Sequence, residues 1–263
     1  METDPILTEF RDGVLTITLN RPPVLNSFNG AMATALRQAL QRADDETAVR
    51  AVLLTANGRA FCAGQDLADA LPDAAGNMPD LGHIVGHFYN PIILGIRSLE
   101  KPVVCAVNGV AAGAGANLAF ACDITVAAES ATFIQSFAKI GLIPDGGGTF
   151  ILPRIVGLQR AAALTMLGDK LTATRAKEWG LIVDVFPDAE LMDRAMEIAL
   201  RLAAMPTRGI GLSKRGLNAS LGHTLEEQLA MEALLQREAG KTADYAEGVR
   251  AFMEKRKPTF EGR

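Results

Sequence analysis

The sequence predicts an α/β core followed by a mostly helical C-terminal part. Three short apolar segments have the length of buried strands: AVLLTA (51–56), VVCAV (103–107) and ITVAA (124–128). They alternate with segments of helical periodicity, which lie around residues 30–43, 90–99 and 114–121. Such alternation is typical of layered α/β folds. After Asp145 the character changes, and helical patterns dominate.

The N-terminal part begins with a predicted hairpin. The stretch ILTEFRDGVLTITLN alternates apolar and polar residues on both sides of Asp12-Gly13, a favoured turn dipeptide. A helix is expected next, because apolar residues then recur at helical spacing at Met32, Leu36, Leu40 and Ala43. Further on, residues 68–82 contain two prolines and two glycines and predict a long loop, which in compact domains is often functional.

The C-terminal half reads as helices at 146–168 and 172–179, and from 188 to the end. The segments MDRAMEIALRLAAM and LEEQLAMEALLQREAG are expected to be strongly amphipathic. We therefore expect a core over residues 1–200 and a helical C-terminal domain over residues 201–263. Apolar faces between Leu225 and Leu235 exceed what one small layer covers, so this domain is expected to make oligomer contacts.

Composition excludes several classes of function. With 26 basic and 30 acidic residues among 263, the chain has no general cationic surface for nucleic acid. No apolar run approaches the ~20 residues of a membrane span, and the first ten residues do not resemble a signal peptide. The three cysteines lie in apolar surroundings, which favours reduced thiols in a cytoplasmic protein and makes a cysteine nucleophile a remote alternative.

The stretch IPDGGGT (143–149) places one carboxylate, Asp145, between a proline and three glycines. Two interpretations are open from these residues. Asp145 could cap the N-terminus of the following helix, because aspartate is a common N-cap. Alternatively, it could be a catalytic acid or base on bare backbone. A phosphate-binding loop is excluded, because no lysine follows the last glycine.

Two other stretches combine small residues with a predicted strand-to-helix turn. NGVAAGAGANLAFACD (108–123) lacks the third glycine of a dinucleotide fingerprint. Its small residues indicate either close helix packing or backbone N–H groups open to an anion, and RAFCAGQDL (59–67) allows the same choice. His83 and His87 have the spacing of a helical metal pair, but no third ligand is evident, and no metal is expected.

These stretches together resemble the enoyl-CoA hydratase/isomerase family, also called the crotonase superfamily. The likeness extends through LTITLNRPPVLNSFN, AFCAGQDL, KPVVCAVNGVAAGAGANLAFACDI, FAKIGLIPDGGGTFILPRIVG, KEWGLI and YAEGVRAFMEKRKPTF. GQDL, FYNP, VAAGAGA and GLIPDGGGT are most similar to the branch of isomerases that act on the ring epoxide of phenylacetyl-CoA in bacterial phenylacetate catabolism.

The resemblance implies a spiral of repeated ββα units, a helical C-terminal domain and a homotrimer that can pair into a hexamer. It implies an acyl-CoA thioester as substrate, with coenzyme A as part of that substrate and no separate cofactor. Two backbone N–H groups, carried over to Ala63 and Ala114, would receive the thioester oxygen. Ala114 departs mildly from the family, which usually has glycine there.

The family's two hydratase glutamates correspond to Asn117 and Phe137, neither of which exchanges a proton at neutral pH. Asp145 occupies a third family position, used as an acid or base by some isomerases, and is therefore the expected catalytic residue. The remaining pocket residues implied by the resemblance are Leu25, Asp66, Leu67, Tyr89, Asn117 and Phe137, with Lys255 near the CoA phosphates.

The expected activity is conversion of ring-1,2-epoxyphenylacetyl-CoA to oxepin-CoA by proton transfer. A single carboxylate suffices to relocate a proton, whereas addition of water usually needs a second group. An enoyl-CoA hydratase or Δ3,Δ2-enoyl-CoA isomerase is the enzymatic alternative. A non-catalytic acyl-CoA-binding or RNA-binding member is the alternative from another class, because both glutamates are missing.

Overall fold

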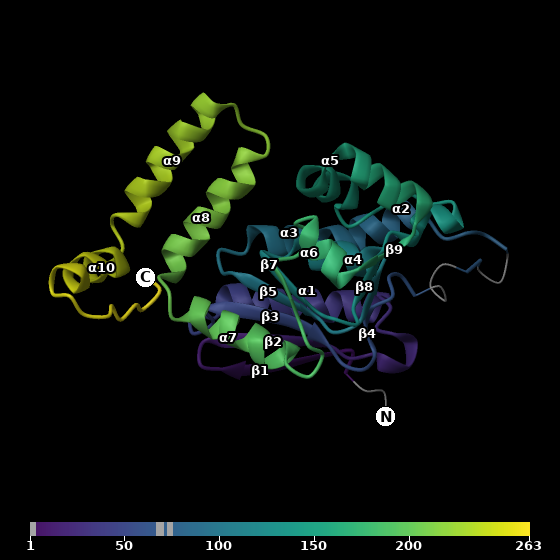
Figure 1. Cartoon of the computed structure of the whole chain (residues 1–263), viewed down its shortest axis with the longest axis horizontal. Coiled ribbons are helices and arrows are strands. Elements are labelled where there is room, and N and C mark those ends of the chain that lie inside the picture. Colours follow the sequence, from purple (N-terminus) through teal and green to yellow (C-terminus); the bar gives the residue numbers. More distant parts are fainter. Residues whose placement is uncertain (1–3, 67–70, 73–75) are drawn as a thin grey trace.

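Figure 1 shows the chain as a computed structural model, in which residues 4–66, 71–72 and 76–263 are described. Six strands form one sheet in the order β1-β2-β3-β5-β7-β10. Their bounds are Ile6–Arg11, Val14–Leu19, Ala51–Ala56, Val103–Val107, Ile124–Ala128 and Asp184–Phe186. β1 and β2 form the predicted antiparallel hairpin, and the other neighbours pair in parallel. The hairpin and the three predicted strands are confirmed.

A second sheet of four short strands, in the order β4-β6-β8-β9, stands beside the first. Its strands are Ala60–Cys62, Val110–Ala112, Thr132–Ile134 and Lys170–Thr172. The first strand of each successive pair, β3, β5 or β7, joins the large sheet, and the second, β4, β6 or β8, joins the small one. The chain thus winds as the expected spiral of ββα units, although the small sheet and β10 were not predicted.

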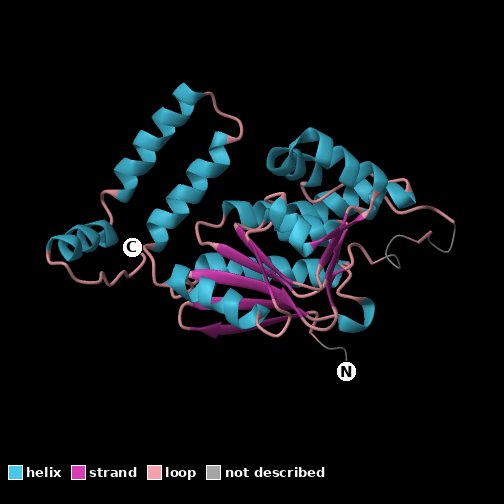
Figure 2. Cartoon of the chain, viewed as in Figure 1, coloured by secondary structure: helices cyan, strands magenta, loops and turns pink. Residues whose placement is uncertain are grey.

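Helices follow the strand pairs and cover the large sheet, as Figure 2 shows. In the core they are α1 (Gly30–Asp45), α2 (Leu81–Ile84), α3 (Asn90–Ser98), α4 (Ala114–Ala121), α5 (Gly148–Leu167), α6 (Ala173–Glu178) and α7 (Leu191–Ala203). α7 packs on β3 and β5. Because the sheet is covered by helices, every residue of β3 and β5 is buried, which explains their continuous apolar sequences.

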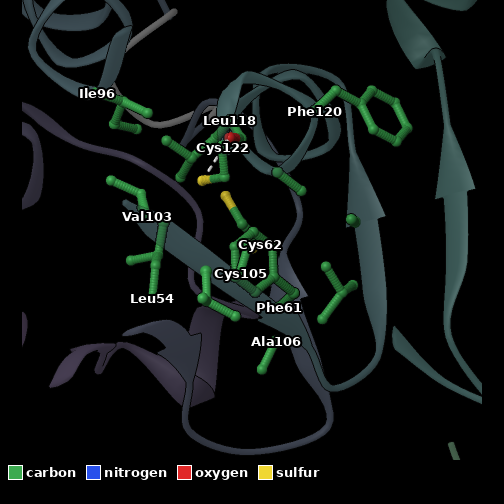
Figure 3. Packing of buried hydrophobic residues seen from close by; sticks show 14 of the residues in the cluster. Leu54, Phe61, Cys62, Ile96, Val103, Cys105, Ala106, Leu118, Phe120 and Cys122 are labelled. Atoms are coloured by element: carbon green, nitrogen blue, oxygen red, sulfur yellow. Dashed lines mark hydrogen bonds between the residues drawn. The ribbon is translucent and has the colours of Figure 1, made fainter. Parts of the chain in front are cut away.

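The three cysteines lie in this core. Figure 3 shows Cys62, Cys105 and Cys122 packed among apolar side chains such as Leu54 and Val103. All three are free thiols, and burial raises the pKa of Cys62 to about 12 and that of Cys105 well above its usual value. Thiols that hold their protons so firmly are poor nucleophiles. The apolar surroundings expected for the three cysteines are confirmed.

α5 is the one described helix with the length and apolar composition of a membrane span, and its backbone argues against that role. Gly157 has non-helical angles (φ 77°, ψ 161°), and Pro153 lies one turn earlier. The break divides α5 into two segments, 148–156 and 158–167, each about half the ~20 residues that a span requires. The sequence had indicated one unbroken helix here.

The C-terminal helices α8 (Thr207–Ser220), α9 (Leu225–Ala239) and α10 (Ala243–Met253) extend away from the sheets as an arm, at the left of Figure 1. The expected strong amphipathicity of LEEQLAMEALLQREAG is wrong for the single chain. Only Leu235 of α9 is buried, whereas Leu225, Leu229 and Leu234 are exposed. Because residue 200 lies within α7, which packs on the sheet, we propose the domain boundary at 204–206 instead.

Candidate active site

Asp145 lies in a tight turn that leads into α5. The N–H of Gly148 donates to the Asp145 carbonyl oxygen (2.9 Å), and Gly146 and Gly147 both have left-handed backbone angles (φ 53° and 80°). Glycine is favoured at such angles because it lacks a Cβ atom. The glycines after Asp145 are therefore required by the turn itself.

The carboxylate of Asp145 does not cap the helix. The N-cap of α5 is Gly147, and no side chain accepts a hydrogen bond from its first turn. Instead, the Asp145 Oδ1 atom is buried and has no hydrogen-bond partner among the described residues. Burial raises the pKa of the Asp145 carboxyl to about 6. A carboxylate with this pKa can accept and return a proton near neutral pH.

The two turns of small residues, predicted separately, lie against each other. A Cβ atom added to Gly115 would come within 2.4 Å of the Cys62 carbonyl oxygen, and one on Gly64 would lie 3.8 Å from the Ala114 nitrogen. Ala114 is the first residue of α4, so its N–H has no partner within the helix. The Ala114 amide is consequently open at the junction of the two turns.

The second expected amide, that of Ala63, is not open. Its N–H donates to the Leu25 carbonyl oxygen at 3.0 Å. Two residues farther on, Gln65 is bridged to Phe28: the Phe28 N–H donates to the Gly64 oxygen (2.7 Å), and the Asp66 N–H donates to the Phe28 oxygen (2.8 Å). The assignment of Ala63 as an oxyanion donor is therefore corrected.

The Gln65 amide differs from that of Ala63. Gly64 and Asp66 make the two hydrogen bonds to Phe28, and Gln65 lies between them. In a parallel pair the N–H and C=O groups of such a middle residue point away from the partner strand. The Gln65 N–H has no partner within the described ranges, and its side-chain Nε2 atom is also buried without one. The sequence alone could not indicate that the Gln65 N–H is open, because this depends on the pairing of Gln65 with Phe28.

Asn117 is fully buried on α4, and its side chain makes hydrogen bonds to two other parts of the chain. Its Nδ2 atom donates to the Asp145 carbonyl oxygen (2.8 Å), and its Oδ1 atom accepts from Nε2 of Gln135 (2.8 Å). A Cβ atom on Gly148 would approach Asn117 Nδ2 to 2.5 Å. In the single chain the Asn117 amide is thus bonded to the Asp145 turn and to Gln135, and its contact with substrate stays a prediction. Nothing in the sequence pattern had indicated Gln135.

Phe137 and Tyr89 lie close to the open amide of Ala114. The Phe137 ring would lie 3.6 Å from a Cβ atom added to Gly113, the residue before Ala114. Tyr89 packs edge-on against Phe28, with ring centroids 6.0 Å apart. A small apolar cavity lies between the Ala114 and Asp145 regions, and it is lined by Phe28, Tyr89, Ile92, Ile93, Ala114, Leu118 and Gly146.

The expected CoA-contacting residues have mixed outcomes. Half-buried Leu25 adopts a left-handed angle (φ 54°) beside Ala63, and Asp66 forms an ion pair with Arg21 (2.9 Å) that ties the two loops together. Leu67 lies outside the described residues. Lys255 is exposed and follows α10 (Ala243–Met253), and Figure 1 shows α10 well apart from α5. The single chain therefore does not bring Lys255 to the site.

The two histidines are stacked on each other. The rings of His83 and His87 lie 5.4 Å apart and nearly parallel, and both residues are exposed. In the part of the chain that the structure describes, no group of three or more His, Cys, Asp or Glu side chains could hold a metal ion.

Comparisons with known proteins show the family of this chain. The family model for enoyl-CoA hydratase/isomerase matches residues 9–263. A 1,2-epoxyphenylacetyl-CoA isomerase of Escherichia coli (strain K12) is 51% identical over 258 residues, 98% of each chain. A protein of Rhodobacter capsulatus named "Probable enoyl-CoA hydratase" is 44% identical over 263 residues, 100% of each chain. The crystal structure of an enoyl-CoA hydratase from Bacillus anthracis superimposes with a TM-score of 0.92 at 35% identity, covering 98% of this chain and 100% of that one. The chain therefore belongs to the enoyl-CoA hydratase/isomerase family.

Proposed function

We propose that this chain is an isomerase of acyl-CoA thioesters in which Asp145 moves a proton away from the carbon beside the thioester carbonyl. One observation carries the proposal: the buried, unpartnered Oδ1 atom of Asp145 belongs to a carboxyl whose pKa is raised to about 6. The resemblance to the family implies that Asn117 and Phe137 occupy the positions of its two hydratase glutamates, so Asp145 is proposed to act without a second carboxylate from those positions.

The mechanism begins with proton abstraction. Asp145 takes the α proton, the carbon–hydrogen electron pair becomes a carbon–carbon double bond, and the carbonyl oxygen becomes an enolate oxygen. The N–H groups of Ala114 and Gln65 are proposed to donate to that oxygen. Fixed donors of this kind contribute about 10²- to 10³-fold in rate each. Asp145 then returns the proton to another carbon, so the product has the composition of the substrate.

The proposed substrate is ring-1,2-epoxyphenylacetyl-CoA. The carbon–carbon bond shared by its six-membered ring and its epoxide breaks as the ring double bonds shift, which places the oxygen in the seven-membered ring of oxepin-CoA, and Asp145 returns the α proton to a ring carbon. The 51% identical E. coli isomerase supports this choice by its name. The apolar lining of the small cavity, which includes Phe28 and Tyr89, disfavours a polar acyl group beside Ala114. Coenzyme A enters only as part of the substrate, with Leu25 and Asp66 proposed beside it.

Two alternatives share the site. A Δ3,Δ2-enoyl-CoA isomerase needs the same single base, and the 44% identical relative is named as an enoyl-CoA hydratase. Hydration is disfavoured, because the side chain at 117 is an amide that holds the Asp145 turn and cannot activate water. A member that only binds acyl-CoA or RNA would have no use for a carboxyl with a raised pKa.

Turnover of three thioesters tests the proposal. We expect the protein to consume ring-1,2-epoxyphenylacetyl-CoA much faster than a 3-enoyl-CoA, and to hydrate crotonyl-CoA poorly. Faster turnover of the 3-enoyl thioester would favour the double-bond isomerase, and efficient hydration would favour the hydratase. Tight binding of all three without turnover of any would favour the non-catalytic member.

We also infer that the working protein is a cytoplasmic homotrimer or a hexamer formed from two trimers. The exposed apolar residues of α9 and α10, such as Leu225 and Phe252, support the assembly.

A further inference from the structure

A buried chain of side-chain amides connects three elements behind the Asp145 turn. Gln135 follows β8, Asn117 lies on α4, and Asp145 precedes α5. Gln135 Nε2 donates to Asn117 Oδ1, and Asn117 Nδ2 donates to the Asp145 carbonyl oxygen, both at 2.8 Å. Gln135 and Asn117 are 2% and 0% exposed, so water does not compete for these hydrogen bonds.

The direction of the whole chain follows from one atom. The Asp145 carbonyl oxygen can only accept hydrogen bonds, so the Asn117 atom that faces it must be the Nδ2 donor. Asn117 Oδ1 then points to Gln135, which must present Nε2. This order leaves Gln135 Oε1 buried without a partner among the described residues. A buried acceptor without a partner lowers the stability of the fold. Gln135 nevertheless directs Nε2 to Asn117, and this hydrogen bond holds the Asn117 amide in one orientation.

The same contacts determine where the Asp145 carboxylate lies. Its Oδ1 atom has no hydrogen-bond partner within the described ranges, so the backbone of the turn must position it. That backbone wraps the Asn117 side chain: Cβ atoms added to Gly148 and Gly146 would lie 2.5 Å from Asn117 Nδ2 and 3.4 Å from Asn117 Cβ. A change in the Asn117 amide would therefore be transmitted directly to residue 145.

We propose that Gln135, acting through Asn117, is a positioning residue for the Asp145 carboxylate. The inference rests on the proposed function, in which Asp145 is the base. Gln135 fixes the amide orientation of Asn117, and Asn117 holds the turn. Position 117, where the family resemblance would place a second acid, thus holds an asparagine that positions Asp145. Proton transfer depends steeply on distance, and a misplacement of about 1 Å can lower a rate by about 10²-fold.

Two variants test the proposal. Gln135→Met keeps the approximate shape of the side chain but removes the donor to Asn117. Asn117→Leu has a similar size and removes the Nδ2 donor to the Asp145 carbonyl oxygen. Thr55→Val is the matched control, because Thr55 Oγ1 makes a buried hydrogen bond to the Ala106 carbonyl (3.1 Å) between β3 and β5, outside the site.

The measurements are kcat and KM with ring-1,2-epoxyphenylacetyl-CoA, α-proton exchange of phenylacetyl-CoA in D₂O, and the thermal midpoint of each variant. We expect kcat and exchange to fall by about tenfold or more in Gln135→Met and Asn117→Leu, with KM within about threefold. Thr55→Val should lose a similar amount of stability and keep its kcat.

A folded Gln135→Met variant with kcat and exchange within about twofold of Thr55→Val would overturn the proposal, as would a loss confined to KM. Asn117→Leu carries the same test if the methionine variant does not fold. An Asp145→Asn variant measured in parallel separates this inference from the proposed function. If Asp145→Asn is inactive and Gln135→Met is normal, only the positioning role is wrong. If Asp145→Asn is fully active, the proposed function itself fails.

Discussion

The N–H of Ala63 donates to the carbonyl oxygen of Leu25 at a distance of 3.0 Å. This hydrogen bond removes Ala63 from the set of amides that could receive a thioester oxygen. It also holds the loop around Leu25 against the turn that contains Gly64, whose neighbour Gln65 has an open N–H. The proposed oxyanion donors are therefore Gln65 and Ala114, one from each turn.

Replacement of Ala114 by proline tests the donor on α4. Ala114 is the first residue of that helix, where proline is well tolerated and where the backbone N–H makes no intrahelical bond. Ala114→Pro should therefore fold with a thermal midpoint close to that of the parent. Its kcat should fall by about 10²- to 10³-fold, because the enolate loses one fixed donor. A folded proline variant with undiminished kcat would remove Ala114 from the mechanism.

The pH dependence of turnover follows from the Asp145 pKa of about 6. A base must be deprotonated to act, so kcat should rise about tenfold per pH unit below 6 and level off above it. The profile of log kcat against pH measures this directly. The opposite slope, with activity lost as the pH rises through 6, would mean that Asp145 acts first as an acid.

Asp145 should also make the folded protein less stable as the pH rises. Its folded pKa of about 6 lies above the ordinary value of 3.8, so the folded state holds the proton more tightly than the unfolded state does. The free energy of unfolding should therefore decrease between about pH 4 and pH 6 and stay lower above that range, by about 3 kcal/mol.

The Asp145→Asn variant lacks the titrating carboxyl, so its stability serves as the reference for the pH dependence of the parent. Relative to the parent, the midpoint of Asp145→Asn in thermal melts should rise between pH 4 and pH 7. A constant difference between the two proteins across that range would show that burial does not shift the pKa of Asp145.

The C-terminal arm should associate with other copies of the chain. Leu225 and Phe252 are 76% and 82% exposed in the single chain, far more than side chains of this size usually are. Light scattering at micromolar concentration should give the mass of three or six chains. Introduction of lysine at Leu225 should shift that distribution toward smaller species, whereas a monomeric parent protein would contradict the assembly.

The strands and helices that could be predicted are those whose signal is local. AVLLTA, VVCAV and ITVAA are continuous apolar runs because both faces of β3, β5 and β7 are covered. The strands of the small sheet have three residues each, too few to show a period, and they form through pairing between successive turns of the spiral. The spiral repeats in structure, while no repeat was evident in the sequence.

Only the part of the candidate site that has a local signal in the sequence could be predicted. Asp145 and Ala114 stand in short motifs whose glycines and small residues are visible in the sequence. The proposed roles of Asn117 and Gln135 depend on two hydrogen bonds that only the folded chain can form. Asn117 and Asp145 are separated by 28 positions in the sequence, and Gln135 and Asn117 by 18. Ala63 was assigned in place of Gln65 because the direction of each N–H is set by the bridge to Phe28, which is also non-local.

The most direct test of the account is α-proton exchange by the parent and by Asp145→Asn, measured side by side in D₂O with phenylacetyl-CoA. Asparagine keeps the size of the side chain and removes the proton acceptor. The parent should exchange the α protons, and the variant should exchange them at least about 10²-fold more slowly, with thioester affinity unchanged within a few fold. Equal exchange rates in the two proteins would show that Asp145 is not the base.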